Sequence, residues 1–161
     1  MKKILSRRDF MVKGAVGLGA AFIMIGAAGI PGTEALAAEE MEGESMQITV
    51  SANGKTIVYE LNDSQAAKDL YAQLPLSIEV ENYGGIEKIY YPPKKLGTGN
   101  TPLVKAAKPG TLAYYEPWGD VVMFYGRFGS ASGLYELGHV IKGGDLIHYL
   151  SGNIHIEADN N

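Results

Sequence analysis

Short segments in which apolar and polar residues alternate follow one another through most of the chain. The first two, residues 46–50 (MQITV) and 56–61 (TIVYEL), flank Asn53 and Gly54, the dipeptide preferred in two-residue hairpin turns. Alternation with a period of two places every second side chain on the same face of a sheet. The pattern therefore predicts a β-hairpin at the start of the folded region.

One segment has helical rather than strand periodicity. Residues 62–64 (NDS) offer side-chain oxygens that can cap a helix, and apolar residues then recur at helical spacing from Ala66 to Leu74. Pro75 cannot continue a helix, because it has no backbone N–H. We expect one short amphipathic helix between residue 64 and residue 75.

The rest of the chain is a series of short strand-like segments separated by turns rich in glycine, proline and asparagine. These segments are residues 76–81, 87–91, 112–115, 121–125, 137–141, 146–150 and 154–157. Many short strands with a single helix favour an antiparallel barrel or a sandwich. We therefore expect a mainly β domain.

The amino-terminal region has a different pattern. Residues 1–13 are rich in lysine and arginine, residues 14–30 form an apolar run diluted by glycine, and Ala35 and Ala37 supply the small side chains of a cleavage site. This order of basic, apolar and small residues is typical of a secretory signal peptide. The alternative is an uncleaved membrane anchor, which would be the only contact of this protein with a membrane.

These patterns divide the chain into three parts. We expect a signal peptide over residues 1–37, a short acidic linker over residues 38–45 and a single domain over residues 46–161. Without the signal peptide the chain has nine basic and 16 acidic residues, a net charge of about −7. A nucleic-acid partner is not expected for such a surface.

The segment Ser6-Arg7-Arg8-Asp9-Phe10-Met11 resembles the twin-arginine motif of the Tat export pathway. The resemblance implies that the Tat machinery is a partner of the leader, and that the protein folds before it is carried to the periplasm or the outside of the cell. The sequence has no cysteine. This composition excludes disulfides, thiolate nucleophiles, cysteine-ligated zinc and iron–sulfur clusters.

Two segments of the second half resemble the small bacterial cyclophilin-like proteins. They are residues 109–125 (PGTLAYYEPWGDVVMFY) and residues 137–143 (LGHVIKG), and the part from Tyr114 to Asp120 is the most specific. The resemblance extends over about residues 46–157. It implies a closed antiparallel β-barrel of about eight strands with little helix.

The resemblance does not extend to the isomerase arginine. Prolyl isomerisation in true cyclophilins relies on an arginine that weakens conjugation in the amide, but the corresponding residues 79–108 contain no arginine. Arg127 is the only arginine after the leader, and a lysine lacks the planar fork of donors. We assign no catalytic residue and predict a non-catalytic module that binds a peptide or a small ligand. The alternatives are a prolyl isomerase with an unorthodox site and a cofactor-carrying redox accessory protein, a class that often uses this export route.

Aromatic residues are dense in the second half, and some of them are candidates for a ligand groove. The candidate groove residues are Tyr114, Trp118, Phe124, Arg127, Tyr135 and His139. If residues 146–150 and 154–157 form a hairpin, the length of its loop decides whether His148 and His155 share a face. We predict no metal site and no cofactor.

Overall fold

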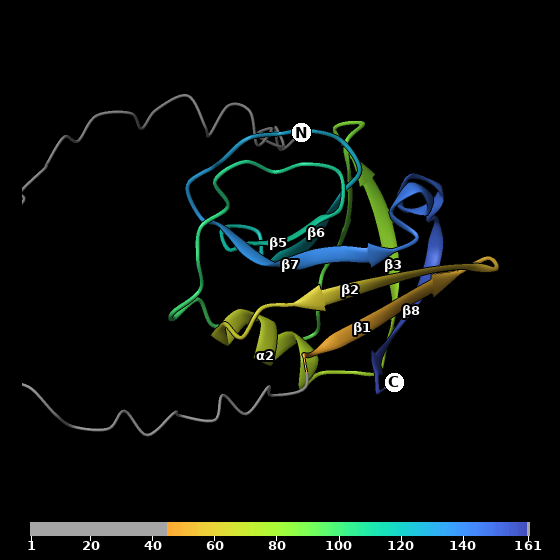
Figure 1. Cartoon of the computed structure of the whole chain (residues 1–161), viewed down its shortest axis with the longest axis horizontal. Helices are drawn as coiled ribbons and strands as arrows, with labels where there is room; N and C mark the ends of the chain where they lie inside the picture. Colours follow the sequence, from red (N-terminus) through yellow and green to blue (C-terminus); the bar gives the residue numbers. More distant parts are fainter. Residues whose placement is uncertain (1–44, 161) are drawn as a thin grey trace, which may run out of the picture. The chain divides into compact units, whose positions relative to one another are not determined.

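The computed structural model describes residues 45–160, and these form a closed barrel of antiparallel strands (Figure 1). The predicted export motif, from Ser6 to Phe10, and the predicted cleavage site at Ala35 and Ala37 lie outside the described residues. No helix within residues 45–160 has the length and apolar character needed to cross a membrane.

The elements follow one another in an order dominated by strands. They are β1 (Gln47–Ala52), β2 (Lys55–Leu61), α2 (Gln65–Tyr71), β3 (Leu76–Tyr83), β4 (Glu87–Tyr90), β5 (Thr111–Tyr115), β6 (Asp120–Phe124), β7 (Leu134–Lys142), the 3₁₀ helix η1 (Gly144–Tyr149) and β8 (Gly152–Asp159). The barrel order is β1-β2-β7-β5-β6-β4-β3-β8, and β8 also pairs with β1. The predicted mainly β fold, a closed antiparallel barrel with a short helix, is confirmed.

The first hairpin forms where the alternation predicts it. Ala52 pairs with Lys55, and the two turn residues Asn53 and Gly54 have φ angles of 51° and 72°. Two successive positive φ angles define the tight turn whose twist matches that of the strands. Because the turn fixes the register, Ile48 and Val50 both lie in the barrel interior.

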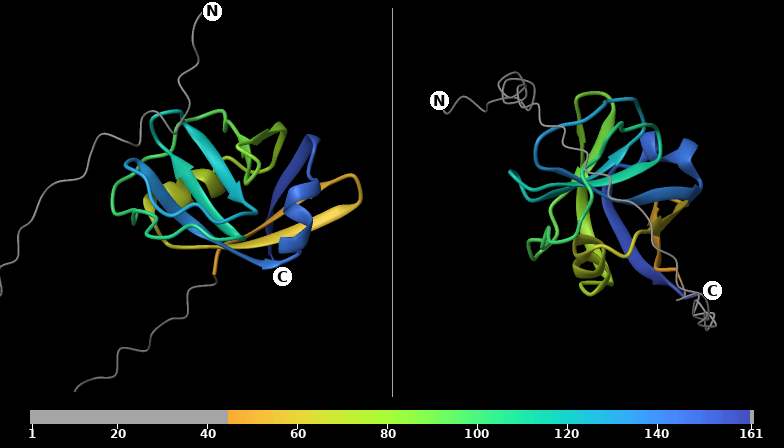
Figure 2. Two further views of the ribbon diagram at one scale, coloured as in Figure 1. Left: turned by 90° about the horizontal axis from the view of Figure 1, so that it is seen from above. Right: turned by 60° about the vertical axis from the view of Figure 1, so that its left-hand side comes forward.

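Helix α2 also begins where the sequence predicts it. The side chain of Ser64 caps the helix by accepting a hydrogen bond from the backbone N–H of Ala67 at 3.3 Å. Ala66, Ala67 and Leu70 are fully buried and belong to the interior cluster of the barrel. The helix therefore covers one end of the barrel, and η1 lies at the opposite end (Figures 1 and 2).

The strand predicted at residues 146–150 is wrong, because this segment belongs to the 3₁₀ helix η1. Alternation would place Leu146, His148 and Leu150 on one face, but the structure buries Ile147 and Leu150, which are three residues apart. That spacing matches one 3₁₀ turn, and the N–H of Leu150 donates to the carbonyl of Ile147 at 3.1 Å.

Residues 146–150 and 154–157 consequently do not form a hairpin with each other. Strand β8 pairs with β1 and β3 instead. His148 lies on η1 and His155 on β8, so the two histidines do not face each other across a common turn.

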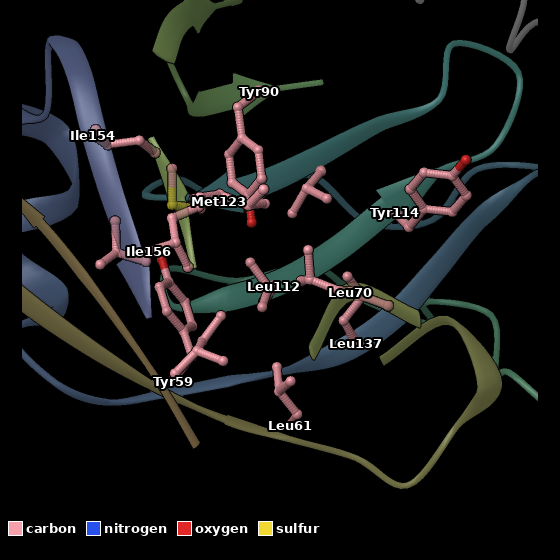
Figure 3. Packing of buried hydrophobic residues seen from close by; sticks show 14 of the residues in the cluster. Tyr59, Leu61, Leu70, Tyr90, Leu112, Tyr114, Met123, Leu137, Ile154 and Ile156 are labelled. Atoms are coloured by element: carbon pink, nitrogen blue, oxygen red, sulfur yellow. The ribbon is translucent and has the colours of Figure 1, made fainter. Parts of the chain in front are cut away.

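Two clusters of buried side chains sandwich β4, β5 and β6. The interior cluster includes Tyr90, Leu112 and Met123, and Figure 3 shows these side chains gathered inside the barrel. The outer cluster includes Ile89 and Val122 together with residues of the segments that follow β4 and β6. Because both faces are covered, these three strands are buried at every position.

Candidate functional site

Three of the six candidate groove residues are packing residues. Tyr114 lies in the barrel interior with 1% of its surface exposed, and its hydroxyl accepts a hydrogen bond from the N–H of Leu96 at 3.3 Å. Trp118 packs edge-on against Tyr115 with the ring centroids 5.7 Å apart. Phe124 is fully buried in the outer cluster. These three aromatic rings stabilise the two clusters.

The other three candidates lie nearer the surface. Arg127 is exposed in the segment after β6, and Tyr135 is half-buried on β7, where its backbone forms an isolated bridge with Leu103. His139 is exposed on the same strand. The structure thus distributes the six candidates over the barrel interior, the outer cluster and the surface, and only His139 lines the groove described next.

A groove of about 610 Å³ lies where the segment before β5 runs beside β7. Its wall combines two lysines, a histidine, a glutamate, a threonine and several small or apolar residues. The lining residues are Pro102, Leu103, Lys105, Ala106, Lys108, Thr111, Glu136, Gly138 and His139. The volume is within the range of small-molecule sites in proteins.

The strand register creates one wall of this groove. Thr111 at the start of β5 lies opposite His139 of β7, and Leu112 lies opposite Gly138. The register shifts after Leu112, so that the next pair is Ala113 and Glu136. A β-bulge of this kind bends a strand and changes the direction of nearby side chains. Glu136, Gly138 and His139 thereby line the same groove.

The other wall is a segment of irregular backbone that hydrogen bonds hold against the barrel. Glu136 donates its N–H to the carbonyl of Pro102 at 2.8 Å, and Val104 donates to Leu134 at 2.9 Å. At the other end of the segment, the N–H of Lys108 donates to Oγ1 of Thr111 at 3.1 Å. The groove is therefore preformed, with a backbone fixed at both ends.

The charges in the groove are mainly positive. Lys105 and Lys108 contribute two ammonium groups on exposed side chains, His139 contributes an imidazole, and Glu136 contributes one carboxylate. Leu103 adds an apolar side chain that is 51% exposed. This combination can bind a ligand that carries both negative charge and an apolar part, by charge-assisted hydrogen bonds and apolar contact.

Sequence reasoning missed the lysines of this groove. Residues 101–110 (TPLVKAAKPG) have no strand or helix pattern that would predict their place in the fold. The available signal was a pair of lysines in a segment with a proline near each end. The position of this segment beside β7 depends on hydrogen bonds with residues about 30 positions further along the chain.

The remaining histidines have local partners. Nδ1 of His155 lies 3.2 Å from the hydroxyl of Ser77, and its Nε2 lies 3.5 Å from Oε2 of Glu157. The ring of His148 packs between Tyr125 and Tyr149, with both centroid distances 5.0 Å. Among residues 45–160, no three side chains of the types that ligate metals gather into a site.

Comparison with known proteins gives a family and similar solved structures. The profile of a family described as the cyclophilin-like family matches residues 50–158. The solution structure of a hypothetical protein from Archaeoglobus fulgidus is similar with a TM-score of 0.54 and 18% sequence identity, over 73% of this chain and 98% of the archaeal one. At that identity the likeness concerns the fold alone. No curated protein matches the chain significantly.

Proposed function

The chain belongs to the cyclophilin-like family, and we propose that it is a binding module whose groove along β7 takes an acidic, partly apolar peptide. The observation that carries the proposal is the pair Lys105 and Lys108 in one groove of about 610 Å³, which has Glu136 as its one carboxylate. A chain with an excess of acidic residues has concentrated positive charge at this place. Such local charge attracts and orients an oppositely charged partner.

The position of Arg127 agrees with a binding role without catalysis. Arg127 is exposed and does not line the groove. Prolyl isomerisation needs a rigidly positioned donor beside the twisted amide, and a flexible ammonium group on a long exposed stem is a poor substitute. The twin-arginine resemblance of residues 6–11 further supports the proposal that the module acts after export, in the periplasm or outside the cell.

The test uses fluorescence anisotropy of the full chain with two labelled decapeptides, one alternating glutamate and leucine and one alternating lysine and leucine. We expect the acidic peptide to bind, and the double variant Lys105→Gln/Lys108→Gln to weaken its binding by about tenfold. The matched control is Lys94→Gln/Lys95→Gln, which removes the same charge from two exposed lysines outside the groove. Equal effects of the two double variants, or no binding of the acidic peptide, would overturn the proposal.

A prolyl isomerisation assay separates the binding module from the isomerase alternative. With an Xaa-Pro peptide and a true cyclophilin as positive control, we expect no acceleration by the full chain. Acceleration within a few hundredfold of the control would contradict the non-catalytic role, and the lysines of the groove would then be the first candidates for the donor.

A further inference from the structure

Lys88 lies on the inner face of the barrel wall. On β4 it shares a face with Tyr90, and on the neighbouring strand β6 it is paired with Met123. Both neighbours belong to the interior cluster. Only 8% of the surface of Lys88 is exposed, which is unusual for a lysine.

No carboxylate of the described residues pairs with the amino group of Lys88. Among residues 45–160 the structure gives Lys88 no ion pair, and its Nζ lies 6.0 Å from the centroid of the Tyr125 ring. The hydroxyl of Tyr125 is engaged with Oδ1 of Asn82 at 2.5 Å, so this ring is held in place. Within the described residues Lys88 therefore has an aromatic neighbour but no counterion.

Burial lowers the pKa of Lys88 from its usual 10.5, because desolvation penalises the charged form. A larger fraction of neutral amine is consequently present near neutral pH than for a solvated lysine. The neutral amine is the nucleophile in imine chemistry, and desolvated lysines are the ones that proteins use for it.

The 3₁₀ helix η1 adds an imidazole at the same end of the barrel. Helix η1 packs against β4, and the ring centroid of His148 lies 5.0 Å from that of Tyr125. Both His148 and Tyr149 are exposed, and the His148 ring contacts the rings of both Tyr125 and Tyr149. An imidazole at this place can transfer protons, and two aromatic rings can hold a flat molecule.

We propose that Lys88 is a reactive lysine whose ε-amino group captures a small aromatic aldehyde as an imine at the end of the barrel covered by η1. The amine nitrogen attacks the carbonyl carbon and forms a carbinolamine. Loss of one water then gives the C=N bond, so that amine and aldehyde are converted into imine and water with no change of oxidation state. The site lies on the inner face of the barrel wall, whereas the groove of the proposed function contains Thr111 on the outer face.

The test treats the full chain with benzaldehyde and sodium cyanoborohydride at neutral pH, which reduces each imine to a stable benzylamine, and maps the labelled lysines by peptide mass. We expect Lys88 to be labelled about tenfold faster than Lys68, an exposed lysine of α2. Lys88→Met keeps an apolar stem of similar size and should abolish the fast label, whereas Lys68→Gln should leave it unchanged.

Two further measurements keep the result interpretable. His148→Gln should slow labelling at Lys88 and leave labelling at Lys68 unchanged. In about 6 M guanidinium chloride, where the barrel is unfolded, the preference for Lys88 should disappear. Labelling of Lys88 in the native chain at or below the rate of Lys68 would overturn the proposal, and so would a preference that persists after unfolding.

Discussion

Two tyrosine hydroxyls inside the barrel have no hydrogen-bond partner among residues 45–160. Tyr59 on β2 and Tyr90 on β4 are 0% and 1% exposed, and their oxygen atoms point into the interior near Met123 (Figure 3). An unpartnered buried hydroxyl costs about 1–3 kcal/mol of desolvation. The rings fill the core, whereas the hydroxyls oppose folding.

Because burial of the Tyr59 hydroxyl costs free energy, removing this hydroxyl should not destabilise the barrel. We expect Tyr59→Phe to leave the free energy of unfolding unchanged or to raise it by up to about 1 kcal/mol. The matched control is Tyr114→Phe, since the hydroxyl of Tyr114 accepts from the N–H of Leu96. That variant should lose about 1–3 kcal/mol. Urea denaturation measures both, and a Tyr59→Phe variant as destabilised as Tyr114→Phe would show that the hydroxyl of Tyr59 has a partner.

The same two tyrosines contribute to how stability responds to alkaline pH. Burial raises the pKa of Tyr59 and of Tyr90 well above the usual 10, and the Tyr90 phenol beside it raises that of Tyr59 further. Above pH ~10 the unfolded chain loses phenolic protons that the folded barrel retains. Stability contributed by these groups is therefore fully present below pH ~10 and falls as pH rises above it.

We expect the free energy of unfolding to decrease from about pH 9.5 to 11, with a shallower decrease in the Tyr59→Phe/Tyr90→Phe variant. Lys88 has the opposite effect on stability. Folding lowers its pKa, so the free-energy cost of burying its charged form disappears as pH rises toward 10.5. Comparing the double variant with the wild type isolates the tyrosines, since Lys88 is present in both. Urea titrations across this pH range give the dependence of the free energy of unfolding on pH for both chains. Equal slopes would contradict the conclusion that these two tyrosines contribute to the decrease.

At the scale of elements, the contact between β2 and β7 depends on a glycine. A Cβ at Gly138 would collide with the carbonyl oxygen of Glu60 and come within 2.9 Å of Cα of Leu61. Both obstacles are backbone atoms of β2, so no side-chain rotation can relieve the contact. Gly138 therefore allows the close approach of the two strands where Leu61 pairs with it.

We predict that Gly138→Ala destabilises the barrel by about 2–4 kcal/mol, because β2 and β7 must separate to admit one methyl group. Gly99→Ala is the matched control, since a Cβ there meets no atom within 4 Å. It should change the free energy of unfolding by less than about 0.5 kcal/mol. Thermal or urea unfolding measures both variants, and equal effects would show that the strands accommodate the methyl group.

Elements with a strong local signal were predictable from sequence, whereas elements defined by distant contacts were not. The Asn53-Gly54 turn and the Ser64 cap depend on neighbouring residues only, and both form as expected. Leu146 to Leu150 was ambiguous, since a five-residue apolar segment fits both a strand and a 3₁₀ turn.

The candidate site was less predictable for a related reason. Tyr114 was a reasonable groove residue by composition, but its position along β5 places it inside the closed barrel. The lysines of the groove can be recognised as site residues only from the backbone hydrogen bond between Val104 and Leu134, which holds their segment beside β7. Neither the inward direction nor that bond follows from local sequence, because both depend on how distant strands pair.

At the scale of the whole molecule, the barrel closes only when the last strand is present. β8 pairs with β1 on one side and with β3 on the other, so the end of the domain completes its beginning. Ile154 and Ile156 of β8 are fully buried in the interior cluster. The domain can therefore complete its core only after the chain has been synthesised to β8, and the export route that we propose for the twin-arginine leader would carry the domain in this closed state.

This dependence on closure predicts a link between folding and export. In a Gram-negative host with an active Tat translocase, we expect Arg7→Lys/Arg8→Lys to retain the folded chain in the cytoplasm. Gly138→Ala, which opens the contact of β2 with β7, should also reduce export, whereas Gly99→Ala should be exported like the wild type. Cell fractionation with and without the translocase measures all four chains. Export of the arginine variant at the wild-type level would refute the Tat route, while equal export of both glycine variants would show that the translocation step does not require the closed barrel.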